Sequence, residues 1–112
     1  MAKYEIDYFE LPVTSAKDTS AFFTKAFGFG SQSFGEGYIE VRDGGVLGGL
    51  SSPGDSAATV VGIRTDDIAA AEKAVTAAGG TISKATTDYP GGKRFFFREP
   101  GGVELLVYQP DE

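Results

Sequence analysis

The sequence predicts an α+β fold made of two tandem βαβββ modules, and three observations predict it. Each half of the chain reads as a strand, a helix and then about three strands, in the same order. The halves are similar in length and meet at SSPGDSA, the most linker-like piece of the sequence. The chain has 112 residues, close to the commonest domain size. We therefore expect a single domain, residues 1–112, in which modules 1–50 and 58–112 are joined by a linker at 51–57.

The first module begins with YEIDYFELPV at residues 4–13, whose aromatic and β-branched side chains indicate a strand. Thr14-Ser15 then offers a helix N-cap, and Gly28 supplies a stop. Between them, apolar residues recur at helical spacing: Ala21, Phe22, Ala26 and Phe27. Residues 31–50 contain two or three short strands between glycine-rich turns.

The second module repeats this order. ATVVGIRT reads as a strand, Asp66 as the cap of a helix, and Gly79-Gly80 as the stop of that helix. TISKATT, GKRFFFRE and GVELLVYQ follow as three strands, with turns at DYPGG and EPGG. The repeat is one of element order, because the two halves share few letters.

Composition and charge exclude several classes of function. The net charge is −6 and the pI about 4.6, which disfavours nucleic acid as a partner because phosphate binding needs a basic patch. The chain has no Cys and no His, so any metal site would need carboxylates, hydroxyls or carbonyls. Neither a signal peptide nor a membrane-spanning run is visible, so we expect no membrane partner and a cytoplasmic location.

The predicted modules also indicate where to look for chemistry. A four-stranded sheet with a helix on one face leaves its other face open. Two such open faces, turned toward one another, can enclose a cavity of the kind that binds small molecules. We therefore expect ligand-binding side chains on the strand positions that face away from the helices.

Three segments carry a resemblance to a known family: FELPVTSAKDTSAFFTKAFGF at 9–29, VGIRTDDIAAAEKAVTAAGG at 61–80, and FFFREPGGVELLVYQ at 95–109. They resemble the first strand and helix, the second-half strand and helix, and the closing hairpin of the vicinal oxygen chelate superfamily. This is the group of glyoxalases, bleomycin resistance proteins and ring-cleaving dioxygenases. The resemblance implies two βαβββ modules whose curved mixed β-sheet forms a groove. It leaves the function open, because the fold hosts lyases, epimerases, dioxygenases and drug-binding proteins.

The resemblance also implies positions for the metal ligands of the family. The two histidines of metal-dependent members fall on Tyr8 and Val60, and the closing glutamate falls on Leu106. Glu40 is the nearest candidate for the first-half carboxylate. Because three of these four positions carry poor ligands or none, we expect no metal and no cofactor.

Strand alternation places further side chains beside these positions. Residues two apart share a face, so Glu10 lies with Tyr8, and Glu104 with Leu106. Glu10 and Glu104 are weak candidates for holding a divalent metal, and they could also form an acid–base pair or attract a cationic ligand. The plainer alternative is that each lies at a wet groove mouth or pairs with an arginine. The residues that we expect to line the groove are Tyr8, Glu10, Tyr38, Glu40, Val60, Arg64, Arg94, Glu104, Leu106 and Tyr108.

Three functions remain open from the sequence. The first is a small-molecule-binding protein of the glyoxalase and bleomycin resistance type, without the catalytic metal. The second is a divalent-metal-dependent lyase, isomerase or dioxygenase that acts on a small metabolite. The third is an accessory domain whose groove meets another protein. In the first two cases the partner is a small molecule. The short chain and its apolar sheet edges fit a homodimer.

Overall fold

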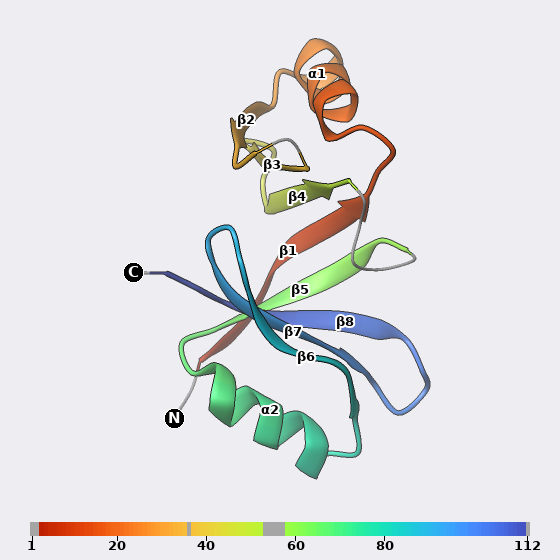
Figure 1. Ribbon diagram of the computed structural model, residues 1–112, viewed down its shortest axis with the longest axis vertical. Coiled ribbons are helices and arrows are strands. Elements are labelled where there is room, and N and C mark those ends of the chain that lie inside the picture. The colour runs from red at the N-terminus through yellow and green to blue at the C-terminus, as the bar shows by residue number, and fades with distance from the viewer. Residues whose placement is uncertain (1–2, 36, 53–57, 112) are drawn as a thin grey trace. The chain divides into compact units, whose positions relative to one another are not determined.

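The computed structural model describes residues 3–35, 37–52 and 58–111. Two helices and eight strands follow one another in the order βαβββ, βαβββ (Figure 1). Their bounds are β1 (Tyr4–Pro12), α1 (Ala16–Phe27), β2 (Gly30–Ser33), β3 (Tyr38–Arg42), β4 (Leu47–Ser51), β5 (Val60–Thr65), α2 (Ile68–Ala77), β6 (Thr81–Tyr89), β7 (Gly92–Arg98) and β8 (Glu104–Pro110). The predicted α+β class and the order of the elements are confirmed. Within the described part of the chain, neither helix is long and apolar enough to cross a membrane.

The described residues fall into two compact units. The first-half unit comprises residues 8–60, and the second-half unit comprises residues 3–7 together with 61–111. The beginning of β1 thus lies with the second half of the chain. Of the predicted linker 51–57, Ser51 ends β4, whereas residues 53–57 lie outside the described residues.

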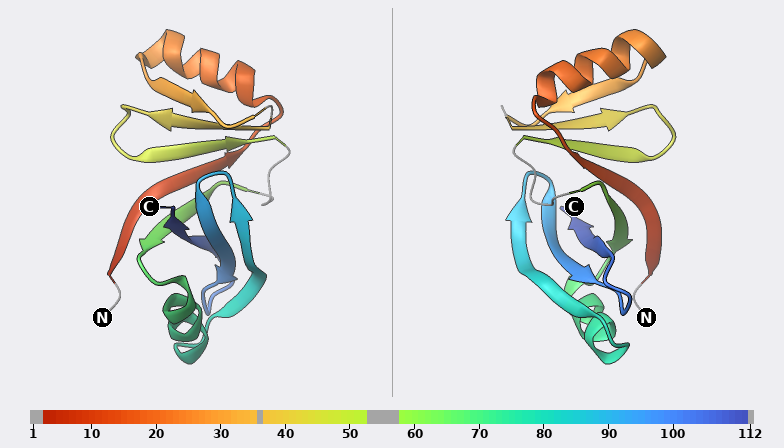
Figure 2. Two further views of the ribbon diagram at one scale, coloured as in Figure 1. Left: turned by 60° about the vertical axis from the view of Figure 1, so that its left-hand side comes forward. Right: turned by 90° about the vertical axis from the view of Figure 1, so that its right-hand side faces the viewer.

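The first-half sheet has the strand order β2-β3-β4-β1. β1 pairs in parallel with β4, and the other two pairings are antiparallel. Helix α1 packs on one face of this sheet, against β2, β3 and β4 (Figure 2). The core beneath α1 is formed by Ala16, Val41 and Leu50, with Leu11, Val13, Phe23, Phe29 and Ile39 packed around them.

The second-half sheet repeats this topology with the order β5-β8-β7-β6. β5 pairs in parallel with β8, and β8-β7 and β7-β6 are antiparallel. Helix α2 covers one face, and the core beneath it consists of Ile68, Ala71, Phe95, Phe97 and Val107. Because the first strand of each unit pairs with its last strand, the predicted internal repeat is confirmed at the level of topology.

The ends of the helices follow local side-chain chemistry. Ser15 caps α1, with its hydroxyl accepting a hydrogen bond from the backbone N–H of Asp18 at 3.1 Å. Gly28 ends α1 with φ +76°, a conformation that favours glycine. The cap of α2 is Asp67 and not Asp66 as predicted. Asp67 accepts from the N–H of Ala70 at 3.1 Å, because it stands one residue before the helix, where a carboxylate reaches the free amides.

The helix-facing sides of the strands are largely those that alternation predicts. Leu11 and Val13 pack in the core beneath α1, and Ile63, Leu105 and Val107 pack in the core beneath α2. Strand alternation also predicts Val61 and Val103 on these faces, but they are exposed, at 42% and 63%. Val103 lies in the turn before β8, and Val61 lies near the start of β5, whereas α2 packs mainly over β6, β7 and β8.

Candidate functional site

The first-half sheet carries a row of polar residues on the face that points away from α1. Glu10 of β1 lies opposite Gly49 of β4, and Gly49 lies opposite Glu40 of β3. The adjacent positions on this face are occupied by Tyr8 and Tyr38. The structure therefore brings together the four predicted groove residues of this half.

The two tyrosines meet above Gly49. Their hydroxyl groups form a hydrogen bond with one another, and both side chains are buried. A β-carbon on Gly49 would clash with both phenol oxygens. The glycine therefore makes room for the phenol pair, which is a packing role and not the phosphate-binding role that glycine-rich segments often have.

The two carboxylates of this face differ in environment. Glu10 is only 1% exposed. Glu40 forms an ion pair with Arg42, in which the Oε1 and Nε atoms are 2.5 Å apart. This pair lies within β3, so the nearest cation to Glu40 comes from its own strand.

The second-half sheet carries the other predicted residues on the face that points away from α2. Arg64, Tyr108 and Arg94 lie side by side on β5, β8 and β7. One step along β8, Leu106 lies between Gly62 and Phe96 on the same strands. The predicted common face of the groove residues in this half is thus present.

Glu104 has a polar partner inside its own unit. Its Oε2 atom accepts a hydrogen bond from the hydroxyl of Ser83 at 2.8 Å, and in the sheet register it lies opposite Arg98. Glu104 and Glu10 belong to different units, so their convergence in one groove stays a prediction.

Tyr108 is a titratable group of this face whose pKa is perturbed. Its hydroxyl donates a hydrogen bond to Oδ1 of Asp7 at 2.6 Å, and the side chain is buried. Burial raises the pKa of Tyr108 well above its usual value, and the bond to Asp7 raises it further. Arg64 opposes this by lowering the pKa. Tyr108 is therefore held as a neutral phenol.

Two cations stack on the aromatic rings beside Tyr108. The guanidinium of Arg94 lies 5.3 Å from the ring centre of Phe96 and 5.2 Å from that of Tyr89. The ammonium of Lys84 lies 4.9 Å from the ring centre of Phe96. These are cation–π contacts. The sequence did not predict the contacts of Lys84 and Tyr89, because the bulges of β6 change the face of the sheet on which each of its side chains lies.

Seven of the ten predicted groove residues are buried, whereas Arg64 is exposed and Glu40 and Glu104 are half-buried. Exposure is 1% for Glu10, 2% for Val60, 0% for Leu106, 4% for Tyr108 and 6% for Arg94. Across the described residues, no group of three or more His, Cys, Asp or Glu side chains is arranged to hold a metal ion.

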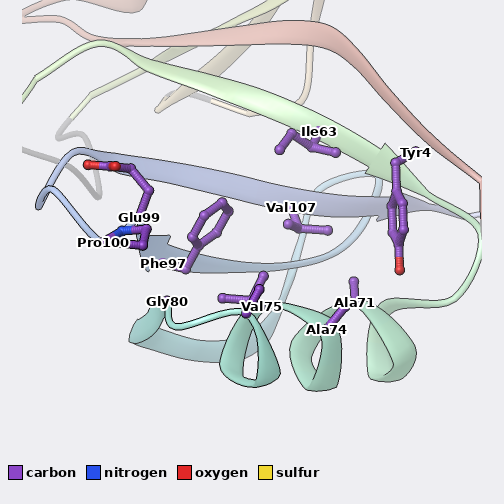
Figure 3. Close-up of a pocket in the computed structure, with 11 residues that line it drawn as sticks. Tyr4, Ile63, Ala71, Ala74, Val75, Gly80, Phe97, Glu99, Pro100 and Val107 are labelled. Atoms are coloured by element: carbon purple, nitrogen blue, oxygen red, sulfur yellow. The ribbon is translucent and has the colours of Figure 1, made fainter.

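A separate apolar cavity of about 350 Å³ lies between α2 and the helix-facing side of the second-half sheet (Figure 3). The sheet contributes Ile63, Phe97 and Val107 to its lining, and α2 contributes a row of small side chains. In Figure 3, Tyr4 stands at one end of the cavity, and Glu99 and Pro100 stand at the other. The complete lining is Tyr4, Ile63, Ala71, Ala74, Val75, Ala78, Gly80, Phe97, Glu99, Pro100 and Val107.

The cavity lies beside the small side chains of α2, of which Ala71 is buried against the sheet and Ala74 and Ala78 are exposed. Ala71, Ala74 and Ala78 recur at helical spacing and leave space that larger residues would fill. This spacing is the one signal in the sequence that could have indicated the cavity.

The carboxylate of Glu99 is occupied by the turn that follows it. Its two oxygens accept hydrogen bonds from the backbone N–H groups of Gly101 at 2.9 Å and Val103 at 2.8 Å. The bond from Val103, and then that from Gly101, lowers the pKa of Glu99. The carboxylate of Glu99 therefore stabilises the turn, and mainly the apolar stem of this side chain lines the cavity.

Comparison with known proteins shows the family of this chain. A sequence profile of the Glyoxalase/Bleomycin resistance protein/Dioxygenase superfamily matches residues 5–107. No curated protein sequence matches the chain.

Several solved structures share the fold. A structure of the NAD-dependent benzaldehyde dehydrogenase from Legionella pneumophila has a TM-score of 0.78 at 10% identity, covering 94% of this chain and 99% of that one. A methylmalonyl-CoA epimerase has a TM-score of 0.68 at 16% identity, covering 96% and 95%. A glyoxalase/bleomycin resistance protein/dioxygenase superfamily member from Vibrio splendidus 12B01 has a TM-score of 0.65 at 16% identity, covering 99% and 100%. At these identities the likeness concerns the fold and carries no activity across.

Proposed function

The chain belongs to the Glyoxalase/Bleomycin resistance protein/Dioxygenase superfamily, and we propose that it is a small-molecule-binding member that works without a catalytic metal. The observation that carries this proposal is the apolar cavity beside α2. Its volume of about 350 Å³ lies in the range of small-molecule sites in proteins.

The lining determines the chemical class of the ligand. Aliphatic and aromatic side chains dominate it, and the carboxylate of Glu99 is already bonded to the backbone. A charged ligand would lose its hydration without gaining a partner. The ligand is therefore a neutral, largely apolar molecule of one or two rings. One polar group on it can reach the hydroxyl of Tyr4.

The donor atoms at the family's metal positions support the metal-free part of the proposal. Val60 and Leu106 have no side-chain atom that binds a metal. The hydroxyl of Tyr8 is bonded to Tyr38, and Glu40 is paired with Arg42. A divalent cation would have to displace these partners and would still lack ligands. We therefore derive no catalytic step through a metal.

A titration with 2-naphthol tests the proposal, because this probe is neutral, aromatic and carries one hydroxyl. We expect binding to the wild-type chain with a dissociation constant on the order of 100 μM, typical of a ligand of this size in an apolar site. Ala74→Phe, which fills the cavity, should weaken binding at least tenfold. Ala77→Phe is the matched control, since Ala77 is exposed on the same helix and lies outside the lining.

Two results would contradict the proposal. Equal binding by Ala74→Phe and Ala77→Phe would place the ligand elsewhere. A stoichiometric divalent metal in protein purified without chelator, lost in Glu10→Gln or Glu40→Gln, would favour the metal-dependent enzyme instead.

A further inference from the structure

A polar pocket of about 270 Å³ lies at one end of the second-half sheet. Three segments form it, namely the beginning of β1, the end of β5 with the turn into α2, and the end of β8. All three segments belong to the second-half unit. The pocket shares no lining residue with the apolar cavity beside α2, so it is a separate site.

The less exposed polar residues of this pocket, Thr65 and Gln109, form its floor. Thr65 is 2% exposed, and its hydroxyl donates to the carbonyl of Asp67 at 3.3 Å and accepts from the N–H of Asp67 at 3.1 Å. Gln109 is half-buried, and its Oε1 atom accepts from the N–H of Ile68 at 2.9 Å. These bonds hold both side chains in place, so a ligand meets an ordered floor.

The bond to Ile68 also determines which way the Gln109 amide points. Because the atom that accepts from an N–H must be Oε1, the other end of the group is Nε2, which carries two N–H donors. In the part of the chain that the structure describes, Nε2 makes no hydrogen bond. The floor therefore offers a fixed donor for an oxygen atom of a ligand.

Charged side chains of both signs surround this floor. The cations are Lys3 and Arg64, and the carboxylates are those of Glu5, Asp66 and Asp111. All five residues are exposed, and among the described residues none of them forms an ion pair. Opposite charges thus line one small pocket without neutralising each other.

These charges disfavour the simplest ligands. A divalent metal ion needs several carboxylates close together, and no such group of three is present among the described residues. The three carboxylates repel a simple anion, and Lys3 and Arg64 repel a simple cation. A molecule with one cationic and one anionic group, in contrast, finds a partner for each of them.

We propose that this pocket binds a free α-amino acid in its zwitterionic form. The carboxylate of the ligand accepts hydrogen bonds from the guanidinium of Arg64 and from Nε2 of Gln109, which stand on the neighbouring strands β5 and β8. The ammonium group lies against the carboxylate of Asp66, across the pocket mouth. The small volume suits an amino acid with a short side chain.

Proton–nitrogen NMR of the full chain during titration with L-alanine tests the site. The sequence has two glutamines, Gln32 and Gln109, and no asparagine, so only two side-chain amide groups give signals, and Gln32→Glu assigns them. We expect a saturable shift of the Gln109 signals with a dissociation constant on the order of 1 mM, as for other very small ligands. The signals of Gln32, which is exposed on β2 in the first-half unit, should not move.

Two analogues of L-alanine test the two charges of the ligand separately. N-acetyl-L-alanine keeps the carboxylate and lacks the ammonium group, whereas L-alanine methyl ester keeps the ammonium group and lacks the carboxylate. Each analogue has the same side chain as L-alanine. Each should bind at least tenfold more weakly, because one charge of the pocket loses its partner.

Two substitutions test the same contacts from the side of the protein. Arg64→Gln and Asp66→Asn should each weaken the binding of L-alanine at least fivefold. Lys73→Gln and Asp88→Asn are the matched controls, since both residues are exposed, lie outside the pocket and undergo the same change of charge. They should bind L-alanine like the wild type, and thermal unfolding of all four variants separates loss of the fold from loss of the site.

The proposal is overturned by any of three results. The Gln109 signals could stay in place at L-alanine concentrations well above the expected dissociation constant. Either analogue could bind as tightly as L-alanine, which would mean that the pocket recognises only one charge. Folded Arg64→Gln and Asp66→Asn could bind as well as the two controls, which would place the ligand elsewhere.

Discussion

Gly49 has no side chain, and this leaves room for the hydroxyl groups of two tyrosines to meet. The hydroxyls of Tyr8 and Tyr38 meet directly above its α-carbon, in the space that a β-carbon would take. We expect Gly49→Ala to destabilise the chain by about 1–3 kcal/mol, because the phenols must move apart in a packed interior. Urea denaturation measures this change.

The double variant Tyr8→Phe/Gly49→Ala is the control for this cause. Removing one phenol oxygen removes part of the clash, so Gly49→Ala should cost less in the Tyr8→Phe background than in the wild type. Equal cost in both backgrounds would mean that the glycine acts through its backbone and not by making room for the tyrosines.

Tyr108 predicts a pH dependence of stability. Its pKa is raised in the folded chain by burial and by the bond to Asp7. A raised pKa contributes stability that is complete below the unfolded value of about 10 and is lost as the pH rises toward the folded value. Between pH 8 and pH 11 the wild type should therefore lose about 1.4 kcal/mol more stability than Tyr108→Phe, measured by urea denaturation.

The same variant isolates the hydrogen bond at neutral pH. At pH 8, Tyr108→Phe should cost about 1.5–3 kcal/mol, because the half-buried Asp7 carboxylate loses this donor. A pH dependence that is identical in wild type and variant would show that Tyr108 ionises alike in the folded and unfolded chain.

Side-chain partnerships are the part of the site that the sequence could not provide. Alternation correctly predicted that Glu104, Leu106 and Tyr108 share a face. It could not predict that Glu104 bonds to Ser83, because that contact depends on the register of β6, which bulges twice. Hydrogen bonds between residues far apart in the sequence depend on the register of the strands. A hydrophobic pattern predicts the face of the sheet on which a residue lies, but it does not predict that register.

At the scale of elements, the N-cap of α2 allows the contributions of two neighbouring aspartates to stability to be compared. Asp67→Ala should lower the free energy of unfolding by about 1 kcal/mol, because the N–H of Ala70 loses its acceptor. Asp66→Ala should change it by less than about 0.5 kcal/mol, since Asp66 is an exposed residue outside the helix. Thermal unfolding of the two variants side by side measures the difference, and equal losses would reject the assignment of the cap.

Most elements could be predicted because their signals are local. Ser15 and Gly28 delimit α1, and the turn at PGG separates β7 from β8. The Asp66 prediction failed by one residue, since two consecutive aspartates both satisfy the capping preference. Only the geometry decides which of them reaches the free amides.

The cavity beside α2 could not be predicted from periodicity alone. The alanines that line it carry the same pattern as a tightly packed helix face. Whether such a face closes on the sheet or leaves a space depends on the volumes of Ile63, Phe97 and Val107 opposite it. That is a property of three-dimensional packing.

At the scale of the whole molecule, the chain shares the fold of its family, whereas the loss of the catalytic metal is our proposal. The topology of both halves and the family match agree. The positions that the resemblance assigns to the metal ligands carry a phenol, two aliphatic side chains and an ion-paired carboxylate. Such divergence of sites on a conserved topology is common, because fold and function are carried by different residues.

The proposal of a metal-free function leads to a prediction for the intact protein. Protein expressed and purified without chelator should contain less than about 0.1 equivalents of any divalent metal, as measured by elemental analysis, because oxygen sites without several carboxylates bind divalent ions weakly. Addition of Mg²⁺, Mn²⁺ or Zn²⁺ should leave the midpoint of thermal unfolding unchanged, since a ligand that binds the folded state must raise it.

Methyl NMR of the intact chain during titration with 2-naphthol tests the central claim most directly. We predict saturable shifts of the methyl groups of Ile63, Ala74 and Val75, which line the cavity, with the methyl group of Ala77 unaffected. Chelator should make no difference to these shifts. The account would be contradicted if the cavity methyl groups stayed unchanged at saturating probe, or if their shifts required an added divalent metal.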